Sequence, residues 1–227
     1  MKIAVVQHRL RPAPAQDLEA LVAAAGEAAR RGALVVVLPP VPAVQNGPLS
    51  EELWRRLDEA APGVSVLMLA PLEGHAGTLH VQDAEPLGRL ALITGDSVID
   101  PAALSGAAAK KPEVAVVSPQ SESELQAEAF IELGIGLSTS LAALVIIAET
   151  DGAPVGEPGH GGTAVLHLGE VLAEAMGGDD LLLSDMGVPI GLPEPPGALP
   201  EIPLLLAQRL AAHRGQKLNV DYPADLD

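Results

Sequence analysis

The chain has 227 residues, no cysteine, three aromatic residues and a formal net charge of -17. Apolar residues make up 48% of it, which suffices for a buried core and excludes wholesale disorder. The negative charge and the scarcity of rings exclude nucleic-acid binding, since phosphates are repelled and bases find no stacking surface. The same charge disfavours anionic membranes. Without cysteine, the chain has no disulfides, thiolate metal sites or cysteine nucleophiles.

Two apolar stretches fall short of the lengths that direct a chain to or across a membrane. The N-terminal MKIAVVQ holds a run of about five apolar residues, whereas the apolar region of a signal peptide needs roughly seven to fifteen. The stretch 133–148 contains three hydroxyl residues and is shorter than the about 20 residues of a bilayer span. The sequence therefore predicts a cytoplasmic protein with no membrane partner.

The first half of the chain alternates apolar runs with amphipathic segments. In chain order we predict strand 2–8, helix 17–31, strand 33–38, helix 51–61 with Ser50 as its N-cap, strand 64–70, a short strand 78–82, strand 89–94, helix 101–111 and strand 113–117. Pro101 follows Asp100, and proline is favoured at the first position of a helix. Fully apolar strands that alternate with helices indicate an α/β layered fold.

The second half begins with a helix, 121–135, which a capping box at 121–124 opens. There follow strand 141–148, a Gly/Pro loop 151–162, three short antiparallel strands at 163–168, 170–175 and 181–184, a proline-rich stretch 187–203 and an amphipathic helix 202–213. We therefore divide the chain into a layered domain, 1–186, and a proline-rich arm with a C-terminal helix and tail, 187–227.

Familiar site motifs are not found. The glycine-rich segment 156–163 matches neither dinucleotide- nor nucleotide-binding loops and is interpreted as a surface turn. The six histidines show no metal-ligand spacing, so no metal and no cofactor are predicted. Ser138, Thr139 and Ser140 are expected to form a turn or cap before a strand. No GxSxG elbow is present, and a Ser-His-Asp triad stays open because its members need not be close in sequence.

Five segments, in order, resemble the nitrilase superfamily of carbon–nitrogen hydrolases. They are MKIAVVQ at 1–7, AARRGALVVVLP at 28–39, GRLALITGDSVIDPAAL at 88–104, VAVVSP at 114–119 and GGTAVLHLGEVLAEA at 161–175. The resemblance, which spans residues 1 to about 185, implies a four-layer αββα sandwich with two mixed sheets flanked by helices. Members of the family hydrolyse or condense amides and nitriles. Their Cys attacks the carbon, a Glu is the general base, and a Lys steadies the developing negative charge.

This sequence departs from the family pattern at all three catalytic positions. Pro40 stands where the Glu would follow the second strand, and proline carries no acid or base. Thr94 takes the place of the Cys, two residues before Asp96. No lysine lies between Lys2 and Lys110, and Arg89 is too close to Thr94 to replace one. We therefore assign no catalytic residue and expect a catalytically inactive homologue that acts as a binding or assembly module.

The resemblance also implies a homodimer, in which helices 101–111 and 121–135 pack across a two-fold axis. The apolar segment 204–210 would either reach over the partner subunit or cover its own sheet, and the sequence leaves both open. A high apolar content with few charged residues mildly favours an oligomer.

Two alternatives remain. One is an amide or nitrile hydrolase with a rearranged site around Thr94, Asp96 and either His8 or His160 as the base. It predicts a histidine or carboxylate within about 3 Å of the Thr94 hydroxyl. The other is a residual pocket that binds a small molecule without chemistry.

Overall fold

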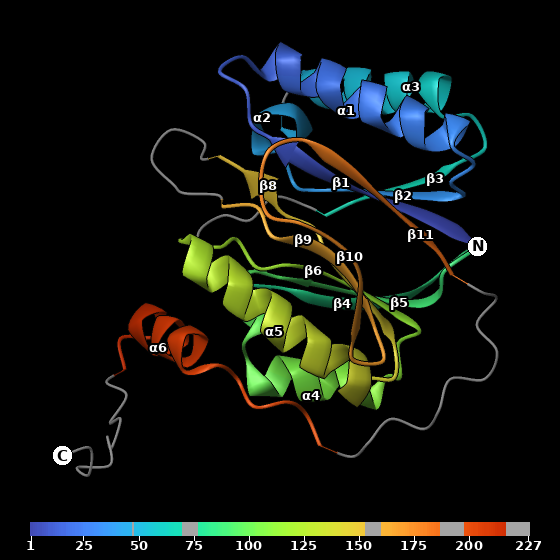
Figure 1. The fold of residues 1–227 in the computed structure, drawn as a ribbon. Helices are drawn as coiled ribbons and strands as arrows, with labels where there is room; N and C mark the ends of the chain where they lie inside the picture. Colours follow the sequence, from blue (N-terminus) through green and yellow to red (C-terminus); the bar gives the residue numbers. More distant parts are fainter. Residues whose placement is uncertain (47, 70–76, 153–159, 187–197, 217–227) are drawn as a thin grey trace, which may run out of the picture.

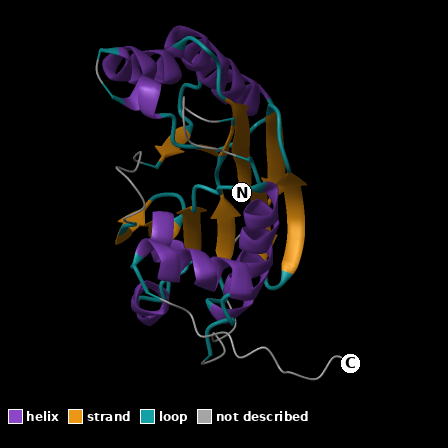
Figure 2. Cartoon of the chain, turned by 90° about the vertical axis from the view of Figure 1, so that its left-hand side faces the viewer, coloured by secondary structure: helices purple, strands orange, loops and turns teal. Residues whose placement is uncertain are grey.

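The computed structural model describes residues 1–46, 48–69, 77–152, 160–186 and 198–216. Two β-sheets face each other, and helices cover the outer face of each sheet (Figure 1). The side view shows the strands between two helical layers (Figure 2). The predicted four-layer αββα sandwich is confirmed.

The first sheet has the strand order β11–β1–β2–β3, and β8 pairs with the end of β1. Its parallel strands are β1 (Lys2–Arg9), β2 (Val35–Leu38) and β3 (Ser65–Met68). β11 (Asp180–Asp185) runs antiparallel to β1, and the short β8 (Thr150–Asp151) runs parallel to it. The first sheet is therefore mixed.

The second sheet has the order β10–β9–β7–β6–β5–β4. Its parallel strands are β5 (Gly88–Thr94), β6 (Val114–Ser118) and β7 (Leu144–Ile147). Antiparallel strands flank them: β4 (Leu79–Ala84), β9 (Thr163–His167) and β10 (Glu170–Ala175). This sheet is mixed as well.

The helices connect the parallel strands and cover the sheets. The helices on the first sheet are α1 (Pro14–Arg30), the short α2 (Pro42–Gln45) and α3 (Leu49–Ala60). The second sheet carries α4 (Pro101–Ala109) and α5 (Glu124–Ser140), and a 3-10 turn, η1 (Gly95–Val98), follows β5. The last helix, α6 (Leu204–His213), packs against α5 of its own chain. Segment 204–210 thus lies against α5 of its own chain, and its Leu206 belongs to the apolar cluster on the second sheet.

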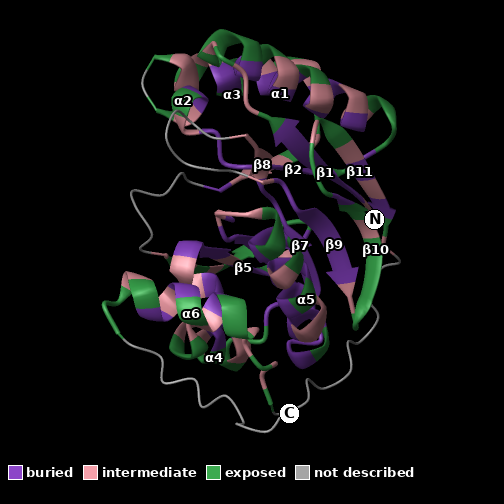
Figure 3. Ribbon diagram, turned by 60° about the vertical axis from the view of Figure 1, so that its left-hand side comes forward, coloured by how far each residue is buried: buried purple, intermediate pink, exposed green. Residues whose placement is uncertain are grey.

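Three apolar clusters correspond to the three interfaces between the four layers. One lies between the sheets and includes Val5, Val116 and Ile146. The second joins the first sheet to α1 and α3, and the third joins the second sheet to α4, α5 and α6. In Figure 3 the inner strands are buried while the outer faces of the helices are exposed. Burial on both faces explains why the central strands are apolar throughout rather than alternating.

Each sheet contains a β-α-β-α-β unit whose three strands run parallel. Parallel strands end at the same edge of a sheet, and ligands of open α/β sheets bind beyond those carboxyl ends. The residues that follow β1, β2, β5, β6 and β7 therefore define the region in which to look for a site.

Several local expectations were wrong. The N-cap of α5 is Ser123, whose hydroxyl accepts the Gln126 N–H, so the capping residue is not Ser121. Ser50 is not the N-cap of α3, because the helix begins one residue earlier, at Leu49, and Pro48 is its N-cap. Residues 138–140 form the last turn of α5 rather than a separate cap. β11 does not complete a meander with β10, since it pairs with β1 in the other sheet. Segments 153–159 and 187–197 lie outside the described residues.

Candidate functional site

Thr94 is the last residue of β5 and is 4% exposed. Its hydroxyl oxygen accepts the backbone N–H of Thr78 at 3.1 Å and lies 2.9 Å from the Thr78 hydroxyl. The Thr94 backbone N–H donates to the Thr78 carbonyl at 3.0 Å. Thr78 therefore engages both the main chain and the side chain of Thr94.

Gly77 brings the preceding segment into direct contact with the same position. A Cβ on Gly77 would lie 2.0 Å from the Thr94 carbonyl oxygen and 2.3 Å from the Ser97 nitrogen. Any other residue would clash with main-chain atoms that cannot turn aside. Residues 77–78 thus lie against the end of β5 and the start of η1.

The two histidines considered as bases have other partners. His8 is buried at the end of β1, and its Nε2 lies 2.8 Å from Asp17 Oδ1 on α1. His160 forms a backbone bridge with Asp151. Within the described part of the chain, no hydrogen bond joins either histidine or Asp96 to the Thr94 hydroxyl.

Neither Pro40, at the position of the family's base, nor Arg89, the cation nearest to Thr94 in the sequence, supplies the missing chemistry. Pro40 is buried and is the second residue after β2, where it offers no ionisable group. Arg89 lies near the start of β5, at the opposite end of the strand from Thr94, and is within 3.6 Å of Asp83. The structure therefore brings no cation from β5 to the Thr94 end of the sheet.

Asp96 does take part in a polar cluster, but one built around α6. Its Oδ2 lies 2.8 Å from His213 Nδ1 and its Oδ1 lies 3.4 Å from Arg209 Nε. Arg209 is 5% exposed although it belongs to a surface helix. Arg214, also at this end of α6, contacts Asp100 at 2.7 Å. The carboxylates that follow β5 are thus neutralised by cations from the C-terminal helix.

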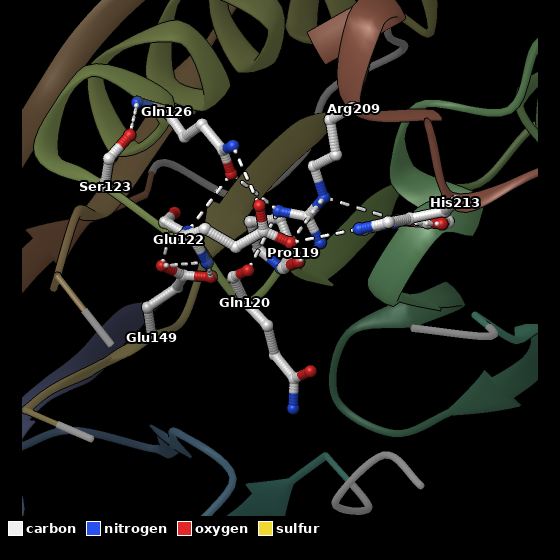
Figure 4. Close-up of polar contacts among 10 residues, drawn as sticks. Pro119, Gln120, Glu122, Ser123, Gln126, Glu149, Arg209 and His213 are labelled. Atoms are coloured by element: carbon white, nitrogen blue, oxygen red, sulfur yellow. Dashed lines mark hydrogen bonds and ion pairs between the residues drawn. The ribbon is translucent and has the colours of Figure 1, made fainter. Parts of the chain in front are cut away.

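The guanidinium of Arg209 has several acceptors (Figure 4). Its Nη2 donates to the Pro119 carbonyl at 2.9 Å. Its Nη1 donates to the Gln120 carbonyl at 2.9 Å and to Gln126 Oε1 at 3.0 Å. The Cζ atom lies 5.4 Å from the centre of the Phe130 ring, within range of a cation–π interaction. Arg209 therefore joins α6 to the loop after β6 and to α5.

Glu149, which follows β7, is a buried carboxyl group at the same end of the sheet. It accepts the Ser121 N–H at 3.0 Å and the Ser121 hydroxyl at 2.7 Å. Burial raises the pKa of Glu149 to about 7, although the Ser121 hydrogen bonds and the charge of Arg209 oppose this shift. A carboxyl group with such a pKa changes its protonation near neutrality.

Polar contacts also link the two sheets beside Glu149. The backbone N–H of Glu149 donates to Thr163 Oγ1 at 3.3 Å. Gln7 Oε1, from the first sheet, accepts the Thr163 N–H at 3.2 Å. Gln7 Nε2 is buried and has no hydrogen-bond partner among the described residues. The carboxyl ends of the parallel strands therefore carry a buried, hydrogen-bonded carboxyl group, Glu149, and the ion-pair cluster around Arg209.

Sequence reasoning missed Glu149 and Arg209. Glu149 directly ends the apolar run LAALVIIA, a position where a charged residue at a strand end could have been noticed. Arg209 stands between Leu206 and Leu210 on the apolar side of α6, where a lone cation interrupts the pattern. Their partners lie 28 and 89 residues away in the sequence, at Ser121 and Gln120. No local pattern connects them.

The described residues include no group of three or more His, Cys, Asp or Glu side chains that could hold a metal ion. Within the same ranges, no helix combines the length and apolar character needed to cross a bilayer.

No family model and no curated protein matches the sequence, but solved structures do match the fold. An amidase from Nesterenkonia sp. AN1 aligns with a TM-score of 0.64 and 18% identity over 95% of this chain and 99% of that one. A cysteine-to-serine mutant of this nitrilase-superfamily amidase has a TM-score of 0.64 and 19% identity, over 82% of this chain and 92% of that chain. The chain has the nitrilase-superfamily fold.

A further structure of that amidase shows acrylamide added to its active-site cysteine, and it aligns with a TM-score of 0.65, 19% identity and coverage of 82% of this chain and 93% of that one. The nitrilase-like chain has no cysteine anywhere in its sequence. The resemblance inferred from five sequence segments is therefore confirmed at the level of the fold, in a chain that lacks the family's nucleophile.

Proposed function

We propose that this nitrilase-like chain is a catalytically inactive homologue that acts as a binding or assembly module in the cytoplasm. The observation that carries the proposal is the burial and hydrogen bonding of Thr94, the residue at the nucleophile position. It is buried, and its hydroxyl is hydrogen-bonded to Thr78. Pro40 at the position of the base and the lack of cysteine support the same conclusion.

A hydrolase with a rearranged site would need a base that removes the proton of the Thr94 hydroxyl. A threonine hydroxyl is a weak nucleophile without such a base. The described hydrogen-bond partners of Thr94 Oγ1 are the backbone and hydroxyl of Thr78, neither of which is a base at neutral pH. This favours the inactive homologue over the rearranged hydrolase.

The assembly role that we propose is a homodimer formed by a nitrilase-like domain, 1–186, with an arm and C-terminal helix, 187–227. Exposed apolar side chains on the side of α5 and α6 support it: Leu125 is 67% exposed and Leu204 is 48% exposed. Surplus apolar surface of this kind favours association. Sedimentation equilibrium that gives the mass of one 23.2 kDa chain at micromolar concentration would contradict the dimer.

The proposed lack of catalysis is tested by measuring the release of ammonia. We expect the purified wild-type chain, incubated with short aliphatic amides and nitriles, to release no more ammonia than buffer does. The Thr94→Ala variant should give the same background, because the hydroxyl that it removes takes no part in chemistry. Turnover by the wild type that disappears in Thr94→Ala would refute the inactive homologue and reinstate the rearranged hydrolase.

The same chains also test for a residual small-molecule pocket. Amides, amines and carboxylates are added during thermal unfolding, since a ligand that binds the folded state raises its melting temperature. Stabilisation without ammonia release would support binding without chemistry.

A further inference from the structure

The acceptors around Arg209 belong to the nitrilase-like domain, and only the guanidinium itself comes from α6. The carbonyls of Pro119 and Gln120 lie in the loop after β6, and Gln126 and Phe130 belong to α5. Asp96 lies on η1. These five residues, which we call the guanidinium pocket, surround one planar cation. Figure 4 shows Pro119, Gln120 and Gln126 among them, facing Arg209.

The geometry of the guanidinium pocket fits a guanidinium better than an ammonium. Two neighbouring carbonyls each accept from a different Nη atom at 2.9 Å, which requires a flat donor fork. The Phe130 ring lies 5.4 Å from Cζ, where a delocalised planar cation can stack. The Asp96 carboxylate adds a negative charge at 3.4 Å from Nε. A lysine ammonium is a compact point charge and could not reach these acceptors together.

The helix that carries Arg209, α6, is only partly buried, whereas Arg209 itself is almost completely buried. Three of the ten residues of α6 are buried, namely Leu206, Arg209 and Ala211. A cavity of about 220 Å³ remains between α6 and the segment around Ile99 and Pro101. The acceptors are thus held by the sandwich, whereas the occupant is carried by a partly exposed helix.

We propose that the guanidinium pocket is a binding site for alkylguanidinium groups, such as those of arginine derivatives and agmatine, and that Arg209 is its internal ligand. An external guanidinium compound competes with Arg209 for the same acceptors. This inference does not depend on the lack of catalysis, since the pocket uses none of the atoms that hold Thr94.

The test is chemical rescue of the Arg209→Ala variant. Ethylguanidinium is the part of the arginine side chain that this substitution removes, so it fits the space left behind. At low millimolar concentrations, where guanidinium salts do not denature, it should raise the melting temperature of the variant in a saturable way. At ten times its dissociation constant the expected rise is about 3–6 °C. The wild type, whose pocket is filled, should shift far less.

Three controls make the outcome decisive. Ethylammonium has the charge without the planar fork, and N-ethylurea has the planar shape without the charge, so neither should stabilise the variant. The Arg56→Ala variant removes an arginine that pairs with Glu19 on the surface, and ethylguanidinium should not stabilise it. Equal shifts in both variants, equal shifts with ethylammonium, or no saturable shift would overturn the proposal. If Arg209→Ala is unfolded, the readout becomes recovery of its folded circular-dichroism signal, with the same controls and the same interpretation.

Discussion

Replacing Arg209 with alanine is expected to lower the free energy of unfolding by about 3–5 kcal/mol, the range seen when one partner of a buried ion pair is removed. The variant leaves the Pro119 and Gln120 carbonyls without their donor and removes the cation that faces Asp96. His213 still contacts Asp96 at 2.8 Å, so we expect the lower end of this range. Urea unfolding monitored by circular dichroism gives the measurement.

Two further variants separate charge from shape. Arg209→Lys keeps a positive charge but not the donor fork. Its free energy of unfolding should therefore lie between those of the wild type and Arg209→Ala. The matched control is Arg56→Ala, which breaks an exposed pair with Glu19 that water screens. Its effect should be much smaller than that of Arg209→Ala. If the two alanine variants lose the same stability, Arg209 does not hold α6 on the sandwich as described.

The second large effect concerns Glu149, whose buried carboxyl group has a pKa of about 7 against an ordinary value of 4.5. A group with a raised folded-state pKa binds more protons in the folded than in the unfolded chain between these values. Its contribution to stability is therefore present below pH 4.5 and is lost as the pH rises to about 7. The loss is about 3 kcal/mol, since one pKa unit corresponds to about 1.4 kcal/mol.

The Glu149→Gln variant cannot ionise, so it should escape this loss. Its stability relative to the wild type is expected to rise by about 3 kcal/mol between pH 4.5 and pH 8. Urea unfolding at several pH values gives the difference. Glu19→Gln provides a control of opposite sign, because the hydrogen bond from Arg56 lowers the pKa of Glu19. A Glu149→Gln difference that stays constant with pH would show that this carboxyl does not titrate as described.

The layered fold could be predicted because it follows from local patterns. Unbroken apolar runs such as Val35–Leu38 are covered on both faces, and the alternation of strands with helices forces parallel pairing. The partner of β11 could not be predicted in this way. Its sequence fits pairing with β10 as well as with β1, and the choice depends on contacts between residues nearly the whole chain apart.

The candidate site, like the fold, could be predicted from the sequence only in part. The sequence indicated that Pro40 and Thr94 cannot perform the family's chemistry, because that conclusion depends only on which side chains are present. It did not indicate that Thr78 holds Thr94, or that Arg209 reaches the strand ends from the C-terminal helix. Such contacts depend on how the layers pack, which the spacing of residues does not encode.

Thr94, at the nucleophile position, is buried, and among the described residues no base is hydrogen-bonded to it that would activate a nucleophile. Because the wild-type chain has no cysteine, Thr94→Cys places a single thiol at this position, and Ser105→Cys places one on the exposed face of α4 as a reference. The measurement is the rate of alkylation by iodoacetamide at pH 7, which depends on thiolate content and access. We predict that the thiol in Thr94→Cys reacts at least about 100-fold more slowly than the reference and fully only after unfolding. Alkylation as fast as the reference, or faster, would contradict a closed position without an activating group.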